Sequence, residues 1–326
     1  MTVIPLFGLG ILGLFFGLIL GFAAKVFHVE VDERVERINE VLPQANCGAC
    51  GYPGCSGFAE AVVNGTAEVN ACIPGGEDTV HKIAEIMGVK ATVGEKKVAF
   101  LKCKGTCMDT KYKYEYNGAI DCKAAVLVSN GDKSCEYGCL GYGTCASVCP
   151  FDAIHINKDT GLPEIDKDKC TACGKCVEEC PRDVLDIIPM NSKVFVSCNS
   201  QDKGAVVKKV CERGCIGCRI CEKVCPFDAI KVSNNIAYID YSLCRECNLC
   251  VEKCPVKVID SKVIKKNKAY IDEDLCIGCT ICKKMCPVDA IEGELKQNHK
   301  VIYEKCIGCG VCAEKCPKKA IEMKDM

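Results

Sequence analysis

The sequence predicts an α+β chain with an apolar helix at its N-terminus, a small helical four-cysteine module and three tandem copies of a cysteine-rich unit. Three observations lead to this architecture. The chain opens with an uncharged stretch of about 22 residues, enough to cross a bilayer core of about 30 Å. Cysteine occurs 33 times in 326 residues. One cysteine–proline motif recurs through the second half of the chain.

The opening stretch, VIPLFGLGILGLFFGLILGFAA, carries no charged side chain and is followed by Lys25. A signal peptide is the first alternative, but it normally has a basic segment before the apolar run, and none precedes this one. We expect residues 1–27 to form an uncleaved, single-pass transmembrane anchor in the plasma membrane. Lys25 fits the positive-inside rule, so the remaining chain is expected on the cytoplasmic side.

The high cysteine content indicates either disulfide bonds or metal sites. Disulfide frameworks usually belong to short secreted chains, whereas metal sites show tight and repeated spacings. The spacings in this chain decide for metal. The net charge of −1 gives no reason to expect a nucleic-acid partner. The four histidines are not spaced as paired ligands and are more often core or surface residues.

The recurring motif is C-x2-C-x2-C-x3-C-P, which is typical of bacterial ferredoxins. Three cysteines of each run hold one cluster, and the fourth reaches the neighbouring cluster. The five complete runs are Cys170, Cys173, Cys176 and Cys180; Cys215, Cys218, Cys221 and Cys225; Cys244, Cys247, Cys250 and Cys254; Cys276, Cys279, Cys282 and Cys286; and Cys306, Cys309, Cys312 and Cys316.

Two runs make one unit with two [4Fe–4S] clusters, and pairing them in order predicts three ferredoxin units over 91–197, 198–262 and 263–326. In the last unit we expect Cys316 to join the first three cysteines of the Cys276 run, and Cys286 to join those of the Cys306 run. Short alternating stretches between the motifs predict strands. Because the interior of each unit is largely cluster, its folding should depend on metal.

The sixth run departs from the motif, because Tyr142 stands between Cys139 and Cys145 where the second ligand belongs; Cys149 ends this run. Cys135 lies four residues before Cys139, as Cys211 lies four residues before Cys215. Two interpretations follow. Cys135 replaces the missing ligand, or Cys135 and Cys211 both belong to something else and the first cluster has three cysteines. We favour Cys135 as the ligand.

A separate four-cysteine module is predicted over residues 28–90, with Cys47, Cys50, Cys55 and Cys72 as ligands. Four thiolates also suit structural zinc. The glycines between them favour a [4Fe–4S] cluster, because they let backbone amides approach the sulfurs. Helices are expected over 56–64 and 77–87, with Gly88 as the C-cap of the second.

Seven clusters are therefore expected, and an eighth is left open. The stretches VAFLKCKGTC and VFVSCNSQDKG both resemble a strand that runs into a cysteine. If they lie together, Cys103, Cys107, Cys122 and Cys198 would form the additional site. The alternative is that these are spare buried thiols.

An N-terminal anchor followed by NCGACGYPGC and ferredoxin repeats resembles the B subunit of the Rnf complex, in its long clostridial or acetogen form. The resemblance covers nearly the whole chain. That complex is a membrane ferredoxin:NAD oxidoreductase that exports Na+ or H+. The resemblance implies that soluble ferredoxin or flavodoxin donates electrons to this chain, which relays them to membrane subunits and to subunits that carry flavin and the NAD site.

The chain itself shows no Walker motif or credible nucleotide fingerprint, so we expect neither NAD nor flavin on it. The alternative is a membrane polyferredoxin that serves a hydrogenase, a heterodisulfide reductase or a corrinoid protein. An acidic ferredoxin would dock on a basic surface. The candidate lysines are Lys257, Lys262, Lys265, Lys266, Lys268, Lys318 and Lys319.

Overall fold

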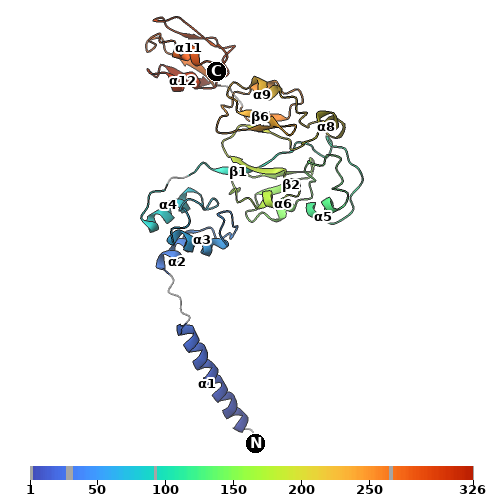
Figure 1. The fold of residues 1–326 in the computed structure, drawn as a ribbon, viewed down its shortest axis with the longest axis vertical. Helices are drawn as coiled ribbons and strands as arrows, with labels where there is room; N and C mark the ends of the chain where they lie inside the picture. The colour runs from blue at the N-terminus through green and yellow to red at the C-terminus, as the bar shows by residue number, and fades with distance from the viewer. Residues whose placement is uncertain (1–2, 27–31, 92–93, 264–266, 326) are drawn as a thin grey trace. The chain divides into compact units, whose positions relative to one another are not determined.

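The computed structural model describes residues 3–26, 32–91, 94–263 and 267–325, and the chain divides into two compact units, Met1–Val93 and Gly94–Met326. The first unit is helical, and the second combines short strands with short helices (Figure 1). Together they give the α+β class that the sequence predicts, with a small helical module before the units of strands and short helices.

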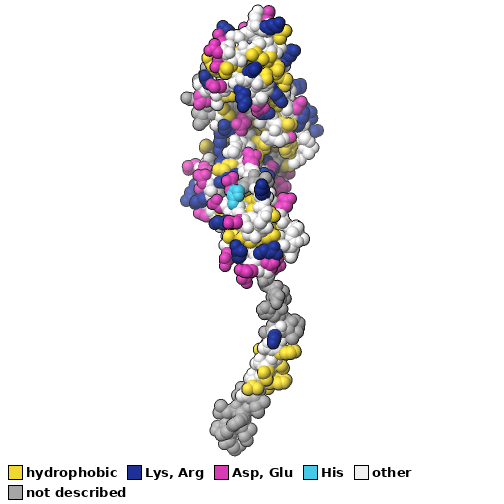
Figure 2. Space-filling model, turned by 90° about the vertical axis from the view of Figure 1, so that its left-hand side faces the viewer, with side chains coloured by type: hydrophobic (Ala, Val, Ile, Leu, Met, Phe, Trp, Pro, Cys, Tyr) yellow, Lys and Arg dark blue, Asp and Glu magenta, His cyan; other side chains and the backbone are white. Residues whose placement is uncertain are grey.

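Helix α1 runs over Val3–Val26 and exposes large apolar side chains, including Leu14 and Phe22. Figure 2 shows hydrophobic side chains on the coloured part of this helix, whereas lysine, arginine and acidic side chains are intermixed on the face of the other domains in view. Within the part of the chain that the structure describes, no helix combines the length and apolarity that a membrane span requires.

Three further helices build the small core of the first unit: α2 over Glu33–Val41, α3 over Gly54–Val63 and α4 over Gly76–Met87. Ile38, Phe58 and Ile83, one from each helix, are almost completely buried together. The predicted C-cap is confirmed, because Gly88 ends α4 in the left-handed conformation with a φ of 66°.

The second unit repeats one pattern three times: an antiparallel pair formed by the first and last strands, and a hairpin between them. The outer pairs are β1 (Lys97–Leu101) with β4 (Leu185–Pro189), β5 (Val194–Val196) with β8 (Ile259–Ser261), and β9 (Asn267–Ile271) with β12 (Ile321–Asp325). The hairpins are β2 (Ile154–Asn157) with β3 (Leu162–Ile165), β6 (Ile230–Ser233) with β7 (Ile236–Ile239), and β10 (Ile291–Glu292) with β11 (Lys300–Val301).

A short helix begins one residue before the third cysteine of each cysteine triplet (in the first run, the triplet Cys139, Tyr142 and Cys145). Of two more helices, one lies before the first run and one between the second and third runs. The triplet helices are α6 (Thr144–Ser147), α7 (Lys175–Glu178), α9 (Ile220–Val224), α10 (Leu249–Glu252), α11 (Ile281–Met285) and α12 (Val311–Lys315). The other two are α5 (Cys122–Leu127) and α8 (Gly204–Val210). None of these helices is long enough to be stable alone, so packing around the cysteines must hold them.

The first two repeats pack against each other through aromatic side chains. The ring of Phe100 on β1 stacks on that of Phe195 on β5, with centroids 5.0 Å apart. The predicted boundary between residues 197 and 198 falls after β5, although β5 pairs with β8 of the predicted second unit. The division into three ferredoxin units at these boundaries stays a prediction.

Gly308, between the first and second cysteines of its loop, is required because another backbone segment passes close to it. In the third repeat, a Cβ added at Gly308 would lie 2.2 Å from the carbonyl oxygen of Asn267, where β9 begins. Gly310 has a similar φ, +74° against +71°, but a Cβ there would meet no described atom within 4 Å. Substituting each glycine in turn therefore distinguishes the cost of backbone strain, which both share, from the cost of a steric clash, which arises at Gly308.

We expect Gly310→Ala to cost about 1–2 kcal/mol, the strain of a left-handed alanine. Gly308→Ala should cost more, because β9 must also move away from the loop. Thermal unfolding of the two variants and the parent under anaerobic conditions measures this difference. Equal losses of stability would contradict the role of the contact with Asn267.

Candidate iron–sulfur sites

The third repeat brings its cysteines together as two sets around two cavities, each of about 350 Å³. One is lined by Cys276, Cys279, Cys282 and Cys316, and the other by Cys286, Cys306, Cys309 and Cys312. In each set, the cysteine before proline comes from the other run. The amides of Ala290 and Ala320 donate hydrogen bonds to the sulfurs of Cys286 and Cys316, over 3.2 and 3.3 Å.

His299 also lines the first of these cavities. It is 1% exposed, and its Nδ1 lies 3.9 Å from the sulfur of Cys276. Sequence reasoning treated the histidines as core or surface residues, and His299 is a core residue. Nothing in its spacing from the cysteines indicated that it would face this cavity.

The second repeat contains the corresponding two sets. A cavity of about 360 Å³ is lined by Cys225, Cys244, Cys247 and Cys250. In the other set, burial together with the nearby thiols of Cys215, Cys218 and Cys254 raises the pKa of Cys221 to about 11. The unliganded Cys221 thiol therefore holds its proton at neutral pH, and iron must displace that proton to bind.

The helical module gathers its four predicted cysteines in the same way. Burial, and then the neighbouring thiols of Cys50, Cys55 and Cys47, raise the pKa of Cys72 to about 11. The amide of Cys55, on α3, donates a hydrogen bond to the side-chain oxygen of Asn46 over 2.8 Å. That bond fixes the start of the helix beside the cysteine loop.

The first repeat has one regular set and one altered set. In the regular set, burial and then the neighbouring thiols of Cys173 and Cys170 raise the pKa of Cys176 to about 12; Cys145, of the altered set, and Cys149 lie near it as well. The altered set consists of Cys122, Cys139, Cys145 and Cys180, which line a cavity of about 380 Å³. Cys122, not Cys135, thus lies where the cysteine missing at Tyr142 would have been.

Cys122 is held in place by a helix cap. It is the first residue of α5, whose N-cap Asp121 accepts a hydrogen bond from the amide of Ala124 over 2.9 Å. The Thr144 hydroxyl donates to the Asp121 carboxylate and accepts from the Cys122 amide, each over 2.7 Å. Since Thr144 precedes Cys145, this cap couples Cys122 directly to the cysteine loop.

Tyr142 has a polar role at the place of the absent ligand. Its hydroxyl donates a hydrogen bond to the Asp132 carboxylate over 2.9 Å, and its ring packs on that of Tyr116. Burial, and then the nearby carboxylate, raise the pKa of Tyr142 well above its usual range, so the hydroxyl stays protonated. No spacing in the sequence indicated Cys122, which lies far upstream of the motif.

Four of the remaining cysteines surround an additional cavity of about 390 Å³: Cys103, Cys135, Cys198 and Cys211. The sequence-based grouping of Cys103, Cys107, Cys122 and Cys198 is therefore not what the structure brings together. Cys103 and Cys198 do meet, but Cys122 belongs to the altered set. Cys107 is exposed, and its thiol donates a hydrogen bond to the carbonyl oxygen of Asp159 over 3.3 Å.

The additional cavity is built symmetrically by the first two repeats. Each repeat supplies one cysteine after its first strand, Cys103 after β1 and Cys198 after β5, and one cysteine four residues before its first motif cysteine. The amide of Cys139 donates to the sulfur of Cys103 over 3.4 Å. In the second repeat, the amide of Cys215 donates to the sulfur of Cys198 over 3.3 Å. We refer to these four cysteines as the inter-repeat set.

A narrow ladder brings the other two members of this set together. Residues 109–112 run between 210–212 on one side and 132–134 on the other. Isolated bridges join Thr110 to Cys211 and Tyr112 to Lys133. The amide of Lys111 donates to the Val210 carbonyl over 3.1 Å, and its own carbonyl accepts from Ser134 over 2.8 Å. Cys135 and Cys211 therefore approach the cavity from opposite edges of one strand.

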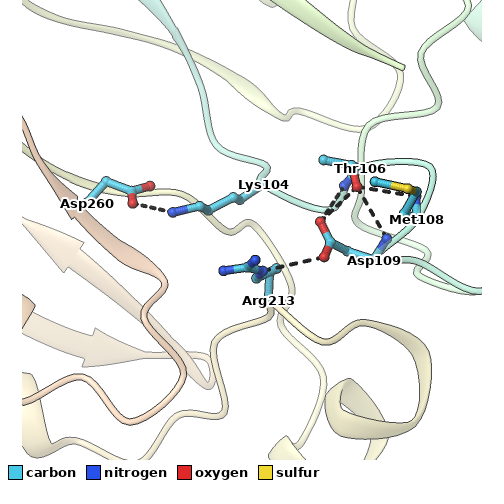
Figure 3. A network of polar contacts seen from close by, with 6 residues as sticks. All are labelled: Lys104, Thr106, Met108, Asp109, Arg213 and Asp260. Carbon is cyan, nitrogen blue, oxygen red and sulfur yellow. Dashed lines mark hydrogen bonds and ion pairs between the residues drawn. The ribbon is translucent and has the colours of Figure 1, made fainter. Parts of the chain in front are cut away.

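A polar network fixes the loop that carries Cys103 against the second repeat (Figure 3). Lys104 forms an ion pair with Asp260 of β8, which also accepts a hydrogen bond from the Ser197 hydroxyl over 2.8 Å. Asp109 pairs with Arg213 at 3.4 Å and accepts from the Thr106 hydroxyl over 2.8 Å. The network thus connects the neighbours of three cavity cysteines.

Asp109 is the most connected carboxylate of this network. Burial alone would raise its pKa, but the hydrogen bonds from Thr106 and the pairing with Arg213 outweigh it and lower the pKa. The ionised form is therefore stabilised by folding. Its contribution is present above the ordinary aspartate pKa of about 3.9 and is lost as the pH falls through the lower value of the folded state.

Adjacent cysteine sets approach one another along the second unit. The inter-repeat set touches the altered set through Cys139 and the second repeat through Cys215, by the amide–sulfur bonds just described. Between the second and third repeats, the thiol of Cys247 lies near that of Cys309. An ion pair of 2.5 Å between Arg245 and Glu314 joins the same two repeats.

The cavities suit iron–sulfur clusters by their donor chemistry. Each has at least four cysteine sulfurs and, at several sulfurs, donating backbone amides, which is the environment that tunes such clusters. The cavities of the altered set and of the third repeat are otherwise mostly apolar, whereas that of the inter-repeat set is lined by polar and charged side chains. Within the described residues, no three Cys, His, Asp or Glu side chains are drawn together tightly enough for a single metal ion. Fold and cysteine sets together define an iron–sulfur protein of the ferredoxin type.

Comparisons with known proteins agree with this class. A family model described as a putative Fe-S cluster matches residues 42–74, and a 4Fe-4S binding domain matches 163–186. Models of a 4Fe-4S dicluster domain match 214–259, 243–290 and 269–323.

Curated relatives extend the match to most of the chain. The B subunit of the Na(+)-translocating ferredoxin:NAD(+) oxidoreductase complex of Acetobacterium woodii is 50% identical, over 80% of this chain and 78% of that protein. Its proton-translocating counterpart in Clostridium ljungdahlii is 45% identical, over 78% and 90%. The B subunit of an ion-translocating oxidoreductase complex of Methanosarcina acetivorans is 42% identical, over 76% and 94%. The chain belongs to this family, the B subunits of Rnf complexes.

A solved structure also aligns with part of the chain. It is a formate dehydrogenase–heterodisulfide reductase–formylmethanofuran dehydrogenase complex from Methanospirillum hungatei, with 23% identity and a TM-score of 0.26 over 58% of this chain and 77% of that one. At this score, the likeness carries no conclusion about function.

Replacing Asp109 tests the network that positions Cys103 and Cys211. We expect Asp109→Asn to lower the free energy of unfolding by about 1–3 kcal/mol, because it weakens hydrogen bonds to a partly buried charge. Amides of residues 103–111 should exchange faster with solvent. Asp228→Asn, which breaks an exposed pair with Lys231 (3.0 Å), is the control and should change stability by at most about 1 kcal/mol. Unaltered exchange in Asp109→Asn would show that the network does not hold the loop.

Proposed function

We propose that this chain is the electron relay of a membrane-bound ferredoxin:NAD oxidoreductase that couples electron flow to Na+ or H+ export. It would accept electrons from reduced ferredoxin or flavodoxin and pass them to partner subunits. The observation that carries the proposal is the succession of cysteine sets, each close to the next along the second unit. Bound clusters supply one-electron transfer, and the chain's residues hold them in order and shield them from water.

We assign eight [4Fe–4S] clusters to the chain. Thirty-two of the 33 cysteines are used, and Cys107 is left over. The proposed ligand sets are Cys47, Cys50, Cys55 and Cys72; Cys122, Cys139, Cys145 and Cys180; Cys149, Cys170, Cys173 and Cys176; Cys103, Cys135, Cys198 and Cys211; Cys215, Cys218, Cys221 and Cys254; Cys225, Cys244, Cys247 and Cys250; Cys276, Cys279, Cys282 and Cys316; and Cys286, Cys306, Cys309 and Cys312.

The inter-repeat set would connect the first two ferredoxin units electrically. The amide–sulfur bonds at Cys103 and Cys198 support this role, because they bring a ligand of each neighbouring cluster into contact with the bridging site. The approach of Cys247 to Cys309 would continue the relay into the third unit. An electron could then travel through all three units without leaving the chain.

The N-terminal segment would attach the chain to the plasma membrane by a single pass, with the clusters on the cytoplasmic side. Its uncharged run of about 22 residues and the exposed apolar side chains of α1 support an anchor. NAD and flavin chemistry, together with ion translocation, would belong to partner subunits. The names of the relatives, which describe subunits of ion-translocating ferredoxin:NAD(+) oxidoreductase complexes, support this division of roles.

Some of the candidate lysines for docking the electron donor already make contacts within the chain. Lys262 lies over the ring of Phe195, and Lys268 donates a hydrogen bond to the Tyr303 carbonyl. Lys265 and Lys266 lie outside the described residues. Lys318 lines a cluster cavity of the third repeat, and Lys319 is next to it, so this end of the third repeat is our candidate for electron entry.

The proposed activity is tested on membranes solubilised anaerobically, with the complex purified through a tag on this chain. We expect the eluate to reduce NAD with reduced ferredoxin as the sole donor, and to contain flavin-bearing and membrane partners. An eluate without that activity, but with a hydrogenase, a heterodisulfide reductase or a corrinoid protein, would assign the relay to a different complex.

The ligand assignment is tested by comparing two cysteines that the sequence could not tell apart. We expect Cys122→Ala to lower the iron content by up to about four atoms per chain, or to leave a three-iron cluster with its own EPR signal. Cys107→Ala should retain the parent's iron and spectrum. If Cys122→Ala keeps its full iron content and shows no new EPR signal, a residue other than Cys122 is the fourth ligand of the altered set.

A further inference from the structure

Lys133 is a cation enclosed beside the inter-repeat set. Its side chain is 2% exposed and lines the cavity together with Cys103, Cys135, Cys198 and Cys211. Among the described residues, its Nζ has no hydrogen-bond partner. The Tyr112 ring lies 5.9 Å from it, which is the outer limit of a cation–π contact.

An enclosed ammonium group needs a counter-charge, because removal from water is costly for an unpaired ion. The adjacent Asp132 is buried too: its Oδ2 accepts from the Tyr142 hydroxyl, and its Oδ1 has no hydrogen-bond partner among the described residues. No ion pair joins Asp132 to Lys133 in the part of the chain that the structure describes. The cysteines that line the cavity remain, and the charge of Lys133 acts on the thiol of Cys139, which lines this cavity as well as that of the altered set. A cluster held by four thiolates is an anion and would supply the missing charge.

The other two cations at this cavity are already neutralised. Lys104 pairs with Asp260, and Arg213 pairs with Asp109. Both are also substantially exposed, so solvent screens them. Of the three cations that line the cavity, Lys133 is thus the one without a carboxylate partner. The buried Arg182 also lies near the Cys135 thiol and donates to the Cys135 carbonyl over 2.7 Å, but it does not line this cavity.

We propose that Lys133 is the charge partner of the cluster bound by the inter-repeat set and that it raises the reduction potential of that cluster. The inference rests on the proposed binding of a cluster there. Reduction adds one electron to the cluster and breaks no bond, so it makes an already negative group more negative. A fixed cation nearby in a low-dielectric cavity stabilises the reduced form more than the oxidised form.

The second repeat provides an internal comparison. Lys209 lies two residues before Cys211, as Lys133 lies two residues before Cys135, so the two lysines occupy equivalent positions in the two halves of the site. Lys209 is exposed at the end of α8. The two halves therefore differ in burial of the cation and not in its sequence position, which makes Lys209 a matched control.

The raised potential would act at the point where electrons pass between the first two units. Lys133 would thereby favour the reduced form of the cluster at this junction.

The test uses the full chain, reconstituted anaerobically with iron and sulfide, and reads potentials by EPR-monitored redox titration. The signal that disappears in Cys135→Ala identifies the inter-repeat cluster. We expect Lys133→Met to retain iron while the equilibrium constant for reducing this cluster falls at least about tenfold, which is about 59 mV for a one-electron couple. Lys209→Met should leave it unchanged.

Lys133→Arg separates charge from packing, because it keeps the cation in a larger side chain. A parental potential in this variant supports the proposal, including the case in which Lys133→Met loses the cluster. Iron loss or a Met-like potential in Lys133→Arg would overturn it. So would an unchanged potential in Lys133→Met with full iron. If Cys135→Ala loses neither iron nor a signal, the cluster assignment itself fails, and the inference about Lys133 fails with it.

Discussion

Everything in the second unit depends on the need to bring four cysteine sulfurs together around each cavity. The strands have two to five residues and the helices four to seven, too short to be stable by themselves. The buried side chains between them include many of the cysteines themselves. Metal binding therefore supplies much of the cohesion that a hydrophobic core supplies elsewhere. Close contacts such as Gly308 against Asn267 are the geometric result.

The inter-repeat site extends the same constraint from one unit to the space between two. Within a ferredoxin unit, the fourth cysteine of each motif joins the first three cysteines of the other motif. At the inter-repeat site, Cys103 and Cys135 of one repeat similarly join Cys198 and Cys211 of the next. The third repeat has Asp272 four residues before its first motif cysteine, where the other two have Cys135 and Cys211. Its connection to the second repeat instead includes the ion pair of Arg245 with Glu314.

Sequence reasoning succeeds where spacing encodes geometry. The five complete motifs and the crossing of Cys286 and Cys316 follow from a loop whose shape is local, and the structure groups those cysteines accordingly. It fails at Cys122 and Cys135, because their positions depend on distant contacts. Cys122 is placed by the Asp121 cap and Thr144, and Cys135 by a ladder with residues 109–112. The alignment of Cys135 with Cys211 did indicate this arrangement, because one of its two interpretations was that both cysteines belong to another site.

The origin of the four inter-repeat ligands has a consequence for biosynthesis. Two come from the first repeat and two from the second. Segment 109–112 of the first repeat joins them, because Thr110 pairs with Cys211 and Tyr112 pairs with Lys133. The four sulfurs of the site come together only when both repeats have folded. A cluster proposed there would therefore be inserted only after the first two repeats have come together, independently of the helical module and the third repeat. Its presence would report that these two repeats are correctly joined.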